Sequence, residues 1–278
     1  LSFTNAHAGA PVCNPSRITV MTGRRPSSLG IYLNDTRWHE AYPGILSIPL
    51  HFKNQGYRVV GGGKVNHHMP GFNRRGDWHD YFDQVFDSPY QQRVAEGGDV
   101  RNFSWPAGFP RNGLEAVRAL AKPPQNASEF DWGPFDRRDE EMGDGRLAEW
   151  IAGFLAAANT IVVVWSDHGW HLGEKQHLHK FTLWERSTRV PFIVMAPGVT
   201  RAGTRSVRPV GLVDLFPTLN ELCGLPPVPT LDGQSLVPLL RDPARAWERP
   251  ALTTHGLGNH SLRDERWRYI RYLDGGEE

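Results

Sequence analysis

The stretch that decides the fold is Thr160-Ile161-Val162-Val163-Val164-Trp165-Ser166-Asp167-His168-Gly169. It opens with uncharged β-branched and aromatic residues, which predict a strand. A continuous apolar run without alternation is typical of a strand buried on both faces, as in a parallel sheet. Polar residues that follow such a strand lie where α/β proteins bind their ligands. Asp167 and His168 could therefore both face a metal ion, although an Asp at this place can also cap a turn.

The segments on either side of this stretch alternate between strand and helix patterns. Residues 191–196 predict a second strand of the same kind, ended by Pro197-Gly198, and residues 57–60 predict a shorter one. Helical patterns occupy residues 15–23, 48–54, part of 139–158, 213–222 and 235–240. Residues 251–255 and 267–273 predict strands, and residues 70–138 predict mostly loop and short helices. Strands that alternate with helices place the chain in the α/β class.

Composition excludes several classes of function. The chain has 278 residues, 39% of them hydrophobic and 22% charged, with a net charge of +1. No basic excess favours nucleic acid, and the apolar runs are far shorter than the ~20 residues of a membrane span. Its two cysteines, Cys13 and Cys223, cannot make a disulfide framework. Cys223 has the pattern of a buried residue near a helix end.

A possible anion site lies around Cys13. The sequence Cys13-Asn14-Pro15-Ser16-Arg17 is followed by Thr22-Gly23-Arg24. Pro15 suits the first turn of a helix, and Gly23 suits its end. A cysteine just ahead of a helix lies where backbone N–H groups and the helix dipole favour negative charge, and Arg17 could reach the same place. Taken alone, a cysteine at such a position is more often structural.

Two lysines stand in comparable places. Gly63-Lys64-Val65-Asn66-His67 follows a predicted strand, but it is not a P-loop because Val65 occupies the hydroxyl position. Lys180 ends the histidine-rich run Gly173-Glu174-Lys175-Gln176-His177-Leu178-His179-Lys180. Taken alone, Lys64 could equally be a solvated lysine beside a surface histidine.

Together these clusters resemble the sulfatase family. Residues 13–24 are similar, position for position, to the signature Cys-x-Pro-Ser-Arg-x-x-x-x-Thr-Gly-Arg, and Gly-Lys-x-x-His and Ser-Asp-His-Gly follow in the same order. The forms Gly-Lys-Val-x-His and Ser-Asp-His-Gly-Trp-x-Leu-Gly-Glu are closest to the iduronate-2-sulfatase branch, and residues 267–272 look like the family's C-terminal strand. The resemblance implies an alkaline-phosphatase-like α/β fold: a mixed, mainly parallel sheet flanked by helices, with a smaller C-terminal antiparallel sheet.

The resemblance also implies roles for individual residues. Cys13 would be oxidised by a formylglycine-generating enzyme, and the aldehyde hydrate would attack the sulfur of a sulfated small molecule or glycan. A bound Ca²⁺, Arg17, Lys64 and Lys180 would neutralise the transferring sulfate. Asp167, His168 and the Cys13-derived group would belong to the metal site. His67 would help the hemiacetal collapse to the aldehyde. Members of the family are often exported to the periplasm, the extracellular space or lysosomes.

The sequence departs from the family pattern in two places. Nothing before Leu1 supplies the paired aspartates that end the family's first strand, and an internal block near Ala158 is missing. Because Ca²⁺ takes ~6–8 oxygen ligands, the residues left are too few for a complete shell. We therefore expect a truncated catalytic domain over residues 1–225 and an incomplete C-terminal subdomain over residues 226–278.

Alternatives remain open at this point. The chain could be an inactive relative that only binds sulfated glycans, or a phosphate- or phosphonate-ester hydrolase on the same fold. A zinc protein is a further alternative because histidines are frequent, although their spacing matches no structural zinc pattern. These histidines are His67, His68, His168, His171, His177 and His179.

Overall fold

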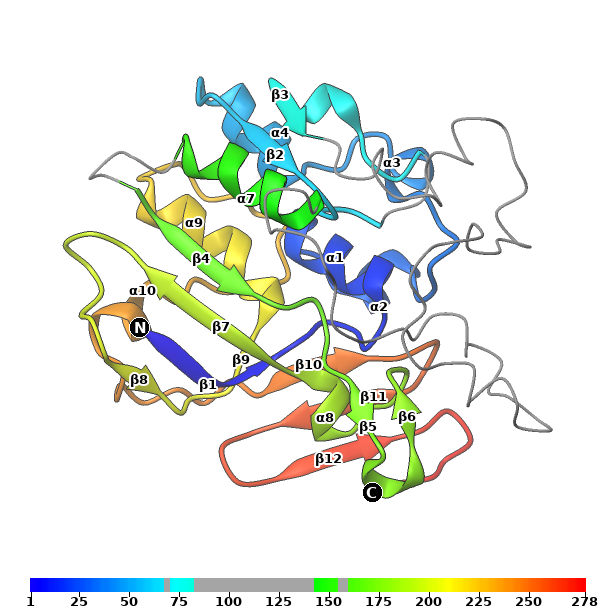
Figure 1. Cartoon of the computed structure of the whole chain (residues 1–278). Coiled ribbons are helices and arrows are strands. Elements are labelled where there is room, and N and C mark those ends of the chain that lie inside the picture. Colours follow the sequence, from blue (N-terminus) through cyan, green and yellow to red (C-terminus); the bar gives the residue numbers. More distant parts are fainter. Residues whose placement is uncertain (68–70, 83–142, 155–159) are drawn as a thin grey trace, which may run out of the picture. The chain divides into compact units, whose positions relative to one another are not determined.

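The computed structural model describes residues 1–67, 71–82, 143–154 and 160–278 (Figure 1). The chain divides into two compact units. The first unit comprises residues 1–60, 65–81 and 157–278, and the second comprises residues 61–64 and 82–156. None of the helices in the described ranges has the length and apolar character needed to cross a membrane. Most of the interval 70–138, where loops and short helices are expected, lies outside the described residues.

A five-stranded sheet forms the centre of the first unit. The strand order is β4-β7-β1-β8, and β9 also pairs with β1. β7 runs antiparallel to both β4 and β1, whereas β8 and β9 run parallel to β1. Their bounds are β1 Ser2–His7, β4 Val162–Trp165, β7 Arg189–Met195, β8 Arg205–Ser206 and β9 Val210–Gly211. The predicted α/β class with a mixed sheet is confirmed, and β1 is a strand that the sequence patterns did not predict.

The two-sided burial predicted for the apolar strands is wrong in the described structure. Along β7, Phe192 and Val194 are fully buried, while Ile193 and Met195, which alternate with them, are 42% and 50% exposed. Val164 of β4, directly across from Ile193, is 52% exposed. Such alternation is typical of an antiparallel strand covered on one face. The sequence does not show this alternation because the residues on the exposed face are themselves apolar.

Helices cover the other face of this sheet (Figure 1). They are α1 (Cys13–Thr22), α9 (Leu215–Leu222) and α10 (Val237–Arg241). Phe3 of β1 and Phe192 of β7 stack with ring centroids 5.3 Å apart at the centre of this core. Complete burial of each such ring contributes about 2–3 kcal/mol relative to exposure. Val20 and Met21 of α1 belong to this core, which holds the last turns of that helix against the strands.

Local signals set the helix ends much as the sequence predicts. Gly23 ends α1 with φ of 63°, a left-handed conformation that favours glycine. Ser47 begins α4 (Ile48–Asn54), since its hydroxyl accepts a hydrogen bond from the Leu50 N–H. The predicted helices at 213–222 and 235–240 appear as α9, preceded by a 3₁₀ turn at Leu212–Asp214, and as α10. Two short helices, α2 (Pro26–Leu29) and α3 (Trp38–Ala41), were not predicted.

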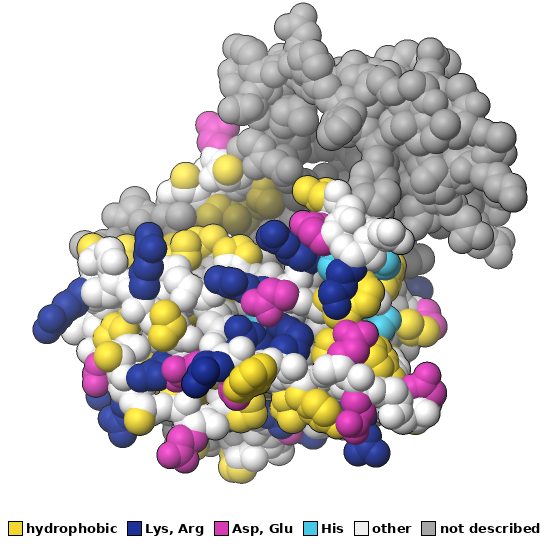
Figure 2. All heavy atoms as spheres, turned by 90° about the horizontal axis from the view of Figure 1, so that it is seen from below, with side chains coloured by type: hydrophobic (Ala, Val, Ile, Leu, Met, Phe, Trp, Pro, Cys, Tyr) yellow, Lys and Arg dark blue, Asp and Glu magenta, His cyan; other side chains and the backbone are white. Residues whose placement is uncertain are grey.

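A three-stranded antiparallel sheet, in the order β10-β11-β12, closes the chain. Its strands are β10 Ala251–Thr254, β11 His260–Arg263 and β12 Arg268–Arg271, of which β11 was not predicted. Arg268 ties this sheet to α8 (Glu185–Thr188), because its guanidinium bonds to Glu185 at 2.6 Å and donates to the Leu183 carbonyl. Figure 2 views this side of the molecule. The predicted domain boundary between residues 225 and 226 stays a prediction.

The remaining elements are short. A hairpin of β5 (His171–Leu172) and β6 (Leu178–His179) follows β4 and contains a 3₁₀ turn at Glu174–Gln176. The strands β2 (Val60–Gly62) and β3 (Asp80–Phe82) pair with each other, and a 3₁₀ turn at Arg75–Asp77 precedes β3. The strand predicted at 57–60 therefore begins later than expected. In the second unit, α7 (Gly143–Ala152) confirms the helix predicted within 139–158, and its Trp150 contacts Phe82.

Replacing Gly169 by Ala should destabilise the fold. An added Cβ would lie 1.9 Å from the Arg186 carbonyl oxygen, a backbone atom that cannot move alone. We expect Gly169→Ala to lower the free energy of unfolding by about 2 kcal/mol or more, measured by urea denaturation. Gly44→Ala is the matched control because its Cβ meets nothing within 4 Å. Equal midpoints for the two variants would contradict this packing.

Stability should fall with acidity because of His7. Burial, aided by the charge of Arg268, lowers the pKa of His7 from 6.5 to about 3. Below pH 6.5 the unfolded chain binds a proton that the folded chain does not, so stability is complete above pH 6.5 and decreases toward pH 3. Denaturation at several pH values should show His7→Asn declining less steeply than the parent, by up to about 1.4 kcal/mol per pH unit. Parallel declines would show that His7 does not carry this dependence.

Candidate active site

Cys13 is the first residue of α1 and is 4% exposed. The next residue, Asn14, holds this helix start in place. Its amide donates to the carbonyls of Leu33 and Thr36, and its backbone N–H donates to the side chain of Asn34. The sulfur is thereby fixed at the positive end of a helix dipole, as the sequence predicts.

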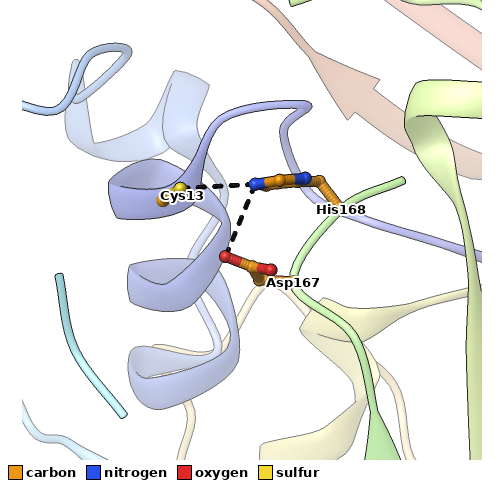
Figure 3. A group of neighbouring side chains, drawn as sticks. All are labelled: Cys13, Asp167 and His168. Carbon is orange, nitrogen blue, oxygen red and sulfur yellow. Dashed lines mark hydrogen bonds and ion pairs between the residues drawn. The ribbon is translucent and has the colours of Figure 1, made fainter. Parts of the chain in front are cut away.

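Two nitrogen atoms from a distant part of the chain approach this sulfur, and Figure 3 shows the one from His168. Lys180 Nζ lies 2.7 Å from Cys13 Sγ, and His168 Nε2 lies 3.3 Å from it. The same two nitrogen atoms are 3.3 Å apart. Lys180 is 9% exposed, so its ammonium acts in a largely dehydrated setting. A cation held there stabilises negative charge that develops on a group at position 13.

Asp167 links this cluster to the body of α1. Its Oδ2 accepts a hydrogen bond from Arg17 Nε at 2.9 Å and lies 3.7 Å from His168 Nε2. The hydroxyl of Ser16 donates to the backbone carbonyl of Asp167. Two consecutive residues of α1 therefore clamp the loop after β4, and this clamp orients His168 toward the sulfur.

The β5–β6 hairpin carries Lys180 to the sulfur. His177 Nε2 lies 2.8 Å from the Lys180 carbonyl oxygen, and the Phe181 N–H donates to the Pro11 carbonyl. His179 and Phe181, on either side of Lys180, have φ of 89° and 73°. Non-glycine residues in this region are uncommon and cost of order 1–3 kcal/mol each, so they persist only where the surroundings hold them. The hairpin thus places Lys180 by a constrained backbone.

The cluster offers three potential metal ligands. The ligand atoms of Cys13, Asp167 and His168 all lie within 4.8 Å of one another. Within the described ranges this group contains one carboxylate, and two cations, Arg17 and Lys180, contact its members. A Ca²⁺ ion takes ~6–8 oxygen ligands. The described residues therefore do not by themselves fit a calcium ion.

The histidines considered for zinc do not converge within the described ranges. The one group of potential ligands found there contains only His168 of that set. His171 Nε2 lies 2.8 Å from the Thr182 hydroxyl, and His177 contacts the Lys180 carbonyl. His68 lies outside the described residues. The geometry of the described histidines gives the zinc alternative no support.

Two predicted residues are placed less directly. His67 is buried, with its ring 5.1 Å from that of Phe72, and it follows Val65, whose carbonyl accepts a hydrogen bond from Arg17. Lys64 belongs to the second unit. The catalytic roles of both remain predictions, as do those of Arg17 and Lys180 and the metal roles of Cys13, Asp167 and His168.

Sequence reasoning missed several residues that shape the cluster. Asn14 anchors the helix start, and His177 and Phe181 position the Lys180 segment. Trp170 lies against it, with Lys180 Nζ 5.8 Å from the ring centroid. The density of His and Trp between residues 168 and 184 was a usable signal. From this stretch the sequence predicts roles for His168 and Lys180 and, as an alternative, a zinc site, but it predicts no role for Trp170 or Phe181.

Comparison with known proteins identifies the family. The sequence profile of the family named Sulfatase matches residues 1–156 and 149–225. A "Sulfatase" of Formosa agariphila is 28% identical over an alignment of 370 positions, which covers 100% of this chain and 73% of that protein. "Arylsulfatase K" of Danio rerio is 35% identical over 146 residues, 48% of this chain and 27% of that protein. The match to the arylsulfatase K protein thus spans about a quarter of its length.

Solved structures agree on the fold. The phosphonate monoester hydrolase SpPMH of Silicibacter pomeroyi superposes with a TM-score of 0.67 at 15% identity, covering 99% of this chain and 81% of that one. BT4656, solved with its substrate D-glucosamine-2-N,6-O-disulfate, gives 0.61 at 17% identity, covering 100% and 83%. At these identities the likeness shows the fold alone. Since the family profile extends from residue 1 to residue 225 of the 278, this chain belongs to the sulfatase family.

Proposed function

We propose that this chain hydrolyses a sulfate ester, with formylglycine made from Cys13 as the catalytic group. The observation that carries the proposal is the meeting of Lys180 Nζ and His168 Nε2 at Cys13 Sγ, at 2.7 and 3.3 Å. Both His168 and Lys180 lie more than 150 positions from Cys13 in the sequence. Sulfatases generally use formylglycine and a divalent metal ion, and the Sulfatase profile covers Cys13 and its partners.

The chemistry requires positive charge around position 13. A hydrated aldehyde there would supply the oxygen nucleophile, and attack on sulfur spreads negative charge over the sulfate oxygens. Lys180 lies close enough to bond a sulfate oxygen or the oxygen of the leaving alcohol. Arg17 is held by Asp167 within the same cluster. His168, whose Nε2 faces position 13, can hold a proton at that atom.

We propose a sulfated sugar as the substrate. The likeness of the Lys64 and Asp167 motifs to the iduronate-2-sulfatase branch favours a sulfated sugar. The solved relatives include one in complex with D-glucosamine-2-N,6-O-disulfate and one in complex with a neocarrahexaose. A sulfated sugar as the substrate of this chain is proposed by analogy of fold. Within that class, we propose a substrate similar to that of the iduronate-2-sulfatases.

Two alternative functions each have an observation in their favour. A phosphonate- or phosphate-ester hydrolase is favoured by the TM-score of 0.67 to SpPMH. Relative turnover of an aryl sulfate and an aryl phosphate would decide between these esters. An inactive relative that only binds sulfated glycans is favoured by the single carboxylate in the described cluster. Absence of turnover in protein that carries formylglycine would support that alternative.

Modification of Cys13 is the first test. When the chain is coexpressed with a formylglycine-generating enzyme, mass spectrometry of the Cys13 peptide should show the loss that accompanies conversion of CH₂–SH to CHO. The peptide with Cys223 is an internal control and should keep its thiol. An unmodified Cys13 in such a host would refute the proposed catalytic group.

Truncation of Lys180 tests the cluster itself. In protein that hydrolyses an aryl sulfate, Lys180→Ala should lower turnover at least about tenfold, because one electrostatic contact to the transferring group is lost. The unfolding midpoint should change little by comparison. Lys53→Ala is the matched control, since that lysine donates to the Gly76 and Trp78 carbonyls, outside the cluster. Unchanged turnover in Lys180→Ala would remove Lys180 from the active site.

A further inference from the structure

Two hollows open on either side of Glu185 and lie outside the catalytic cluster. The larger, of about 780 Å³, is lined by Ser2–Thr4, Trp170, Glu185, Arg186 and Arg189–Pro191. The smaller, of about 370 Å³, is lined by Lys175, Trp184, Glu185, Arg263, Arg266, Arg268, Ile270 and Glu278. Figure 2 looks onto this side and shows Lys and Arg side chains gathered around carboxylates in the middle of the face.

Positive charge is concentrated in these hollows. Two carboxylates line them, those of Glu185 and Glu278. Six cationic side chains line them: Lys175, Arg186, Arg189, Arg263, Arg266 and Arg268. Two further carboxylates pair with these cations, Glu174 with Arg186 at 3.2 Å and Asp264 with Arg263 at 3.9 Å, so six cations minus four carboxylates leaves an excess of +2. Such local asymmetry attracts anions through the field that it creates.

Glu185 does not neutralise the arginines around it. Its carboxylate is shared by Arg268 at 2.6 Å, Arg189 at 3.5 Å and Arg263 at 3.5 Å. Burial opposes ionisation of Glu185, yet the hydrogen bond and charge of Arg268 lower its pKa overall. Asp264, 3.9 Å from Arg263, adds a second carboxylate, so three guanidinium groups face two carboxylates at the border between the hollows.

Two guanidinium groups in the smaller hollow have bonding capacity to spare. Arg268 Nε is buried and has no hydrogen-bond partner within the described part of the chain. A buried unsatisfied donor is unfavourable, and because this Nε has almost no accessible surface, an anion would reach it only after its neighbours shift. Arg266 is exposed, and no carboxylate of the described residues lies within ion-pair distance of its guanidinium. It can meet an anion without losing an internal contact.

The hollows adjoin the catalytic cluster. Trp170 lines the larger hollow, and its ring also lies 4.1 Å from the ring of His179 and 5.8 Å from Lys180 Nζ. Lys175 lines the smaller hollow and belongs to the turn of the same hairpin that carries Lys180. Residues that line the hollows therefore also belong to, or contact, the segment that carries Lys180.

We propose that the two hollows form an accessory binding site for a sulfated oligosaccharide, which rests on the sulfatase activity proposed above. Guanidinium groups bind sulfate oxygens in pairs of hydrogen bonds. The tryptophans in the two walls offer apolar surface for sugar rings. Two separate hollows suit anionic groups spaced along a sugar chain better than the continuous basic track that a nucleic acid backbone requires.

Titration calorimetry with a heparin-derived hexasaccharide tests this site without depending on turnover. The full chain should bind the sulfated hexasaccharide, more weakly as salt increases, and bind its desulfated form at least about tenfold more weakly. Arg266→Glu should reduce affinity at least about fivefold. Arg201→Glu makes the same charge change at an exposed position that lines neither hollow, and it should reduce affinity less than about twofold.

The outcomes separate the two proposals. Equal weakening by Arg266→Glu and Arg201→Glu would indicate non-specific attraction and overturn the accessory site, as would absence of binding. Tighter binding of a DNA oligonucleotide of equal charge would overturn the choice of a glycan. Failure of the parent chain, carrying formylglycine, to hydrolyse a small aryl sulfate would refute the enzymatic proposal instead, whatever the calorimetry shows.

Discussion

The docking of the loop after β4 onto the start of α1 is the constraint on which the site depends. Arg17 and Ser16 hold Asp167, one through its carboxylate and the other through its carbonyl. This clamp brings His168 to the Cys13 sulfur, and the hairpin that follows brings Lys180. Since α1 is packed in the core beneath the sheet, the helix that carries Cys13, Ser16 and Arg17 is held by the most buried part of the fold.

Sequence patterns were most informative where local physical chemistry decides the structure. Gly23 required a left-handed end to α1, and a serine and a proline set the start of α4, so these helices were predictable. The family and the α/β class were also accessible, because the Cys13, Lys64 and Asp167 motifs are specific in combination. The clustering of Cys13, Asp167, His168 and Lys180 followed from that resemblance rather than from composition.

Other features depend on tertiary contacts that no local pattern encodes. The apolar run 162–165 gives no sign that one face of the strand is exposed, because Val164 is as apolar as the buried residues. β1 carries Asn5 and His7 inward, and these polar residues do not fit the apolar pattern from which a buried strand is predicted. Their burial is possible because His7 bonds Asn5 at 2.8 Å and lies near Arg268 from the far end of the chain.

The backbone on either side of Lys180 has a consequence for how the site would be lost. His179 and Phe181 are kept in left-handed conformations at the end of a two-stranded hairpin, whereas α1 is held by the central core. Local opening draws on the parts of a protein where conformational cost is high and buried contacts are few. Warming would therefore release the lysine from the sulfur while the sheet beneath stays folded. The highest temperature at which the site stays assembled would be set by the β5–β6 hairpin rather than by the unfolding of the core.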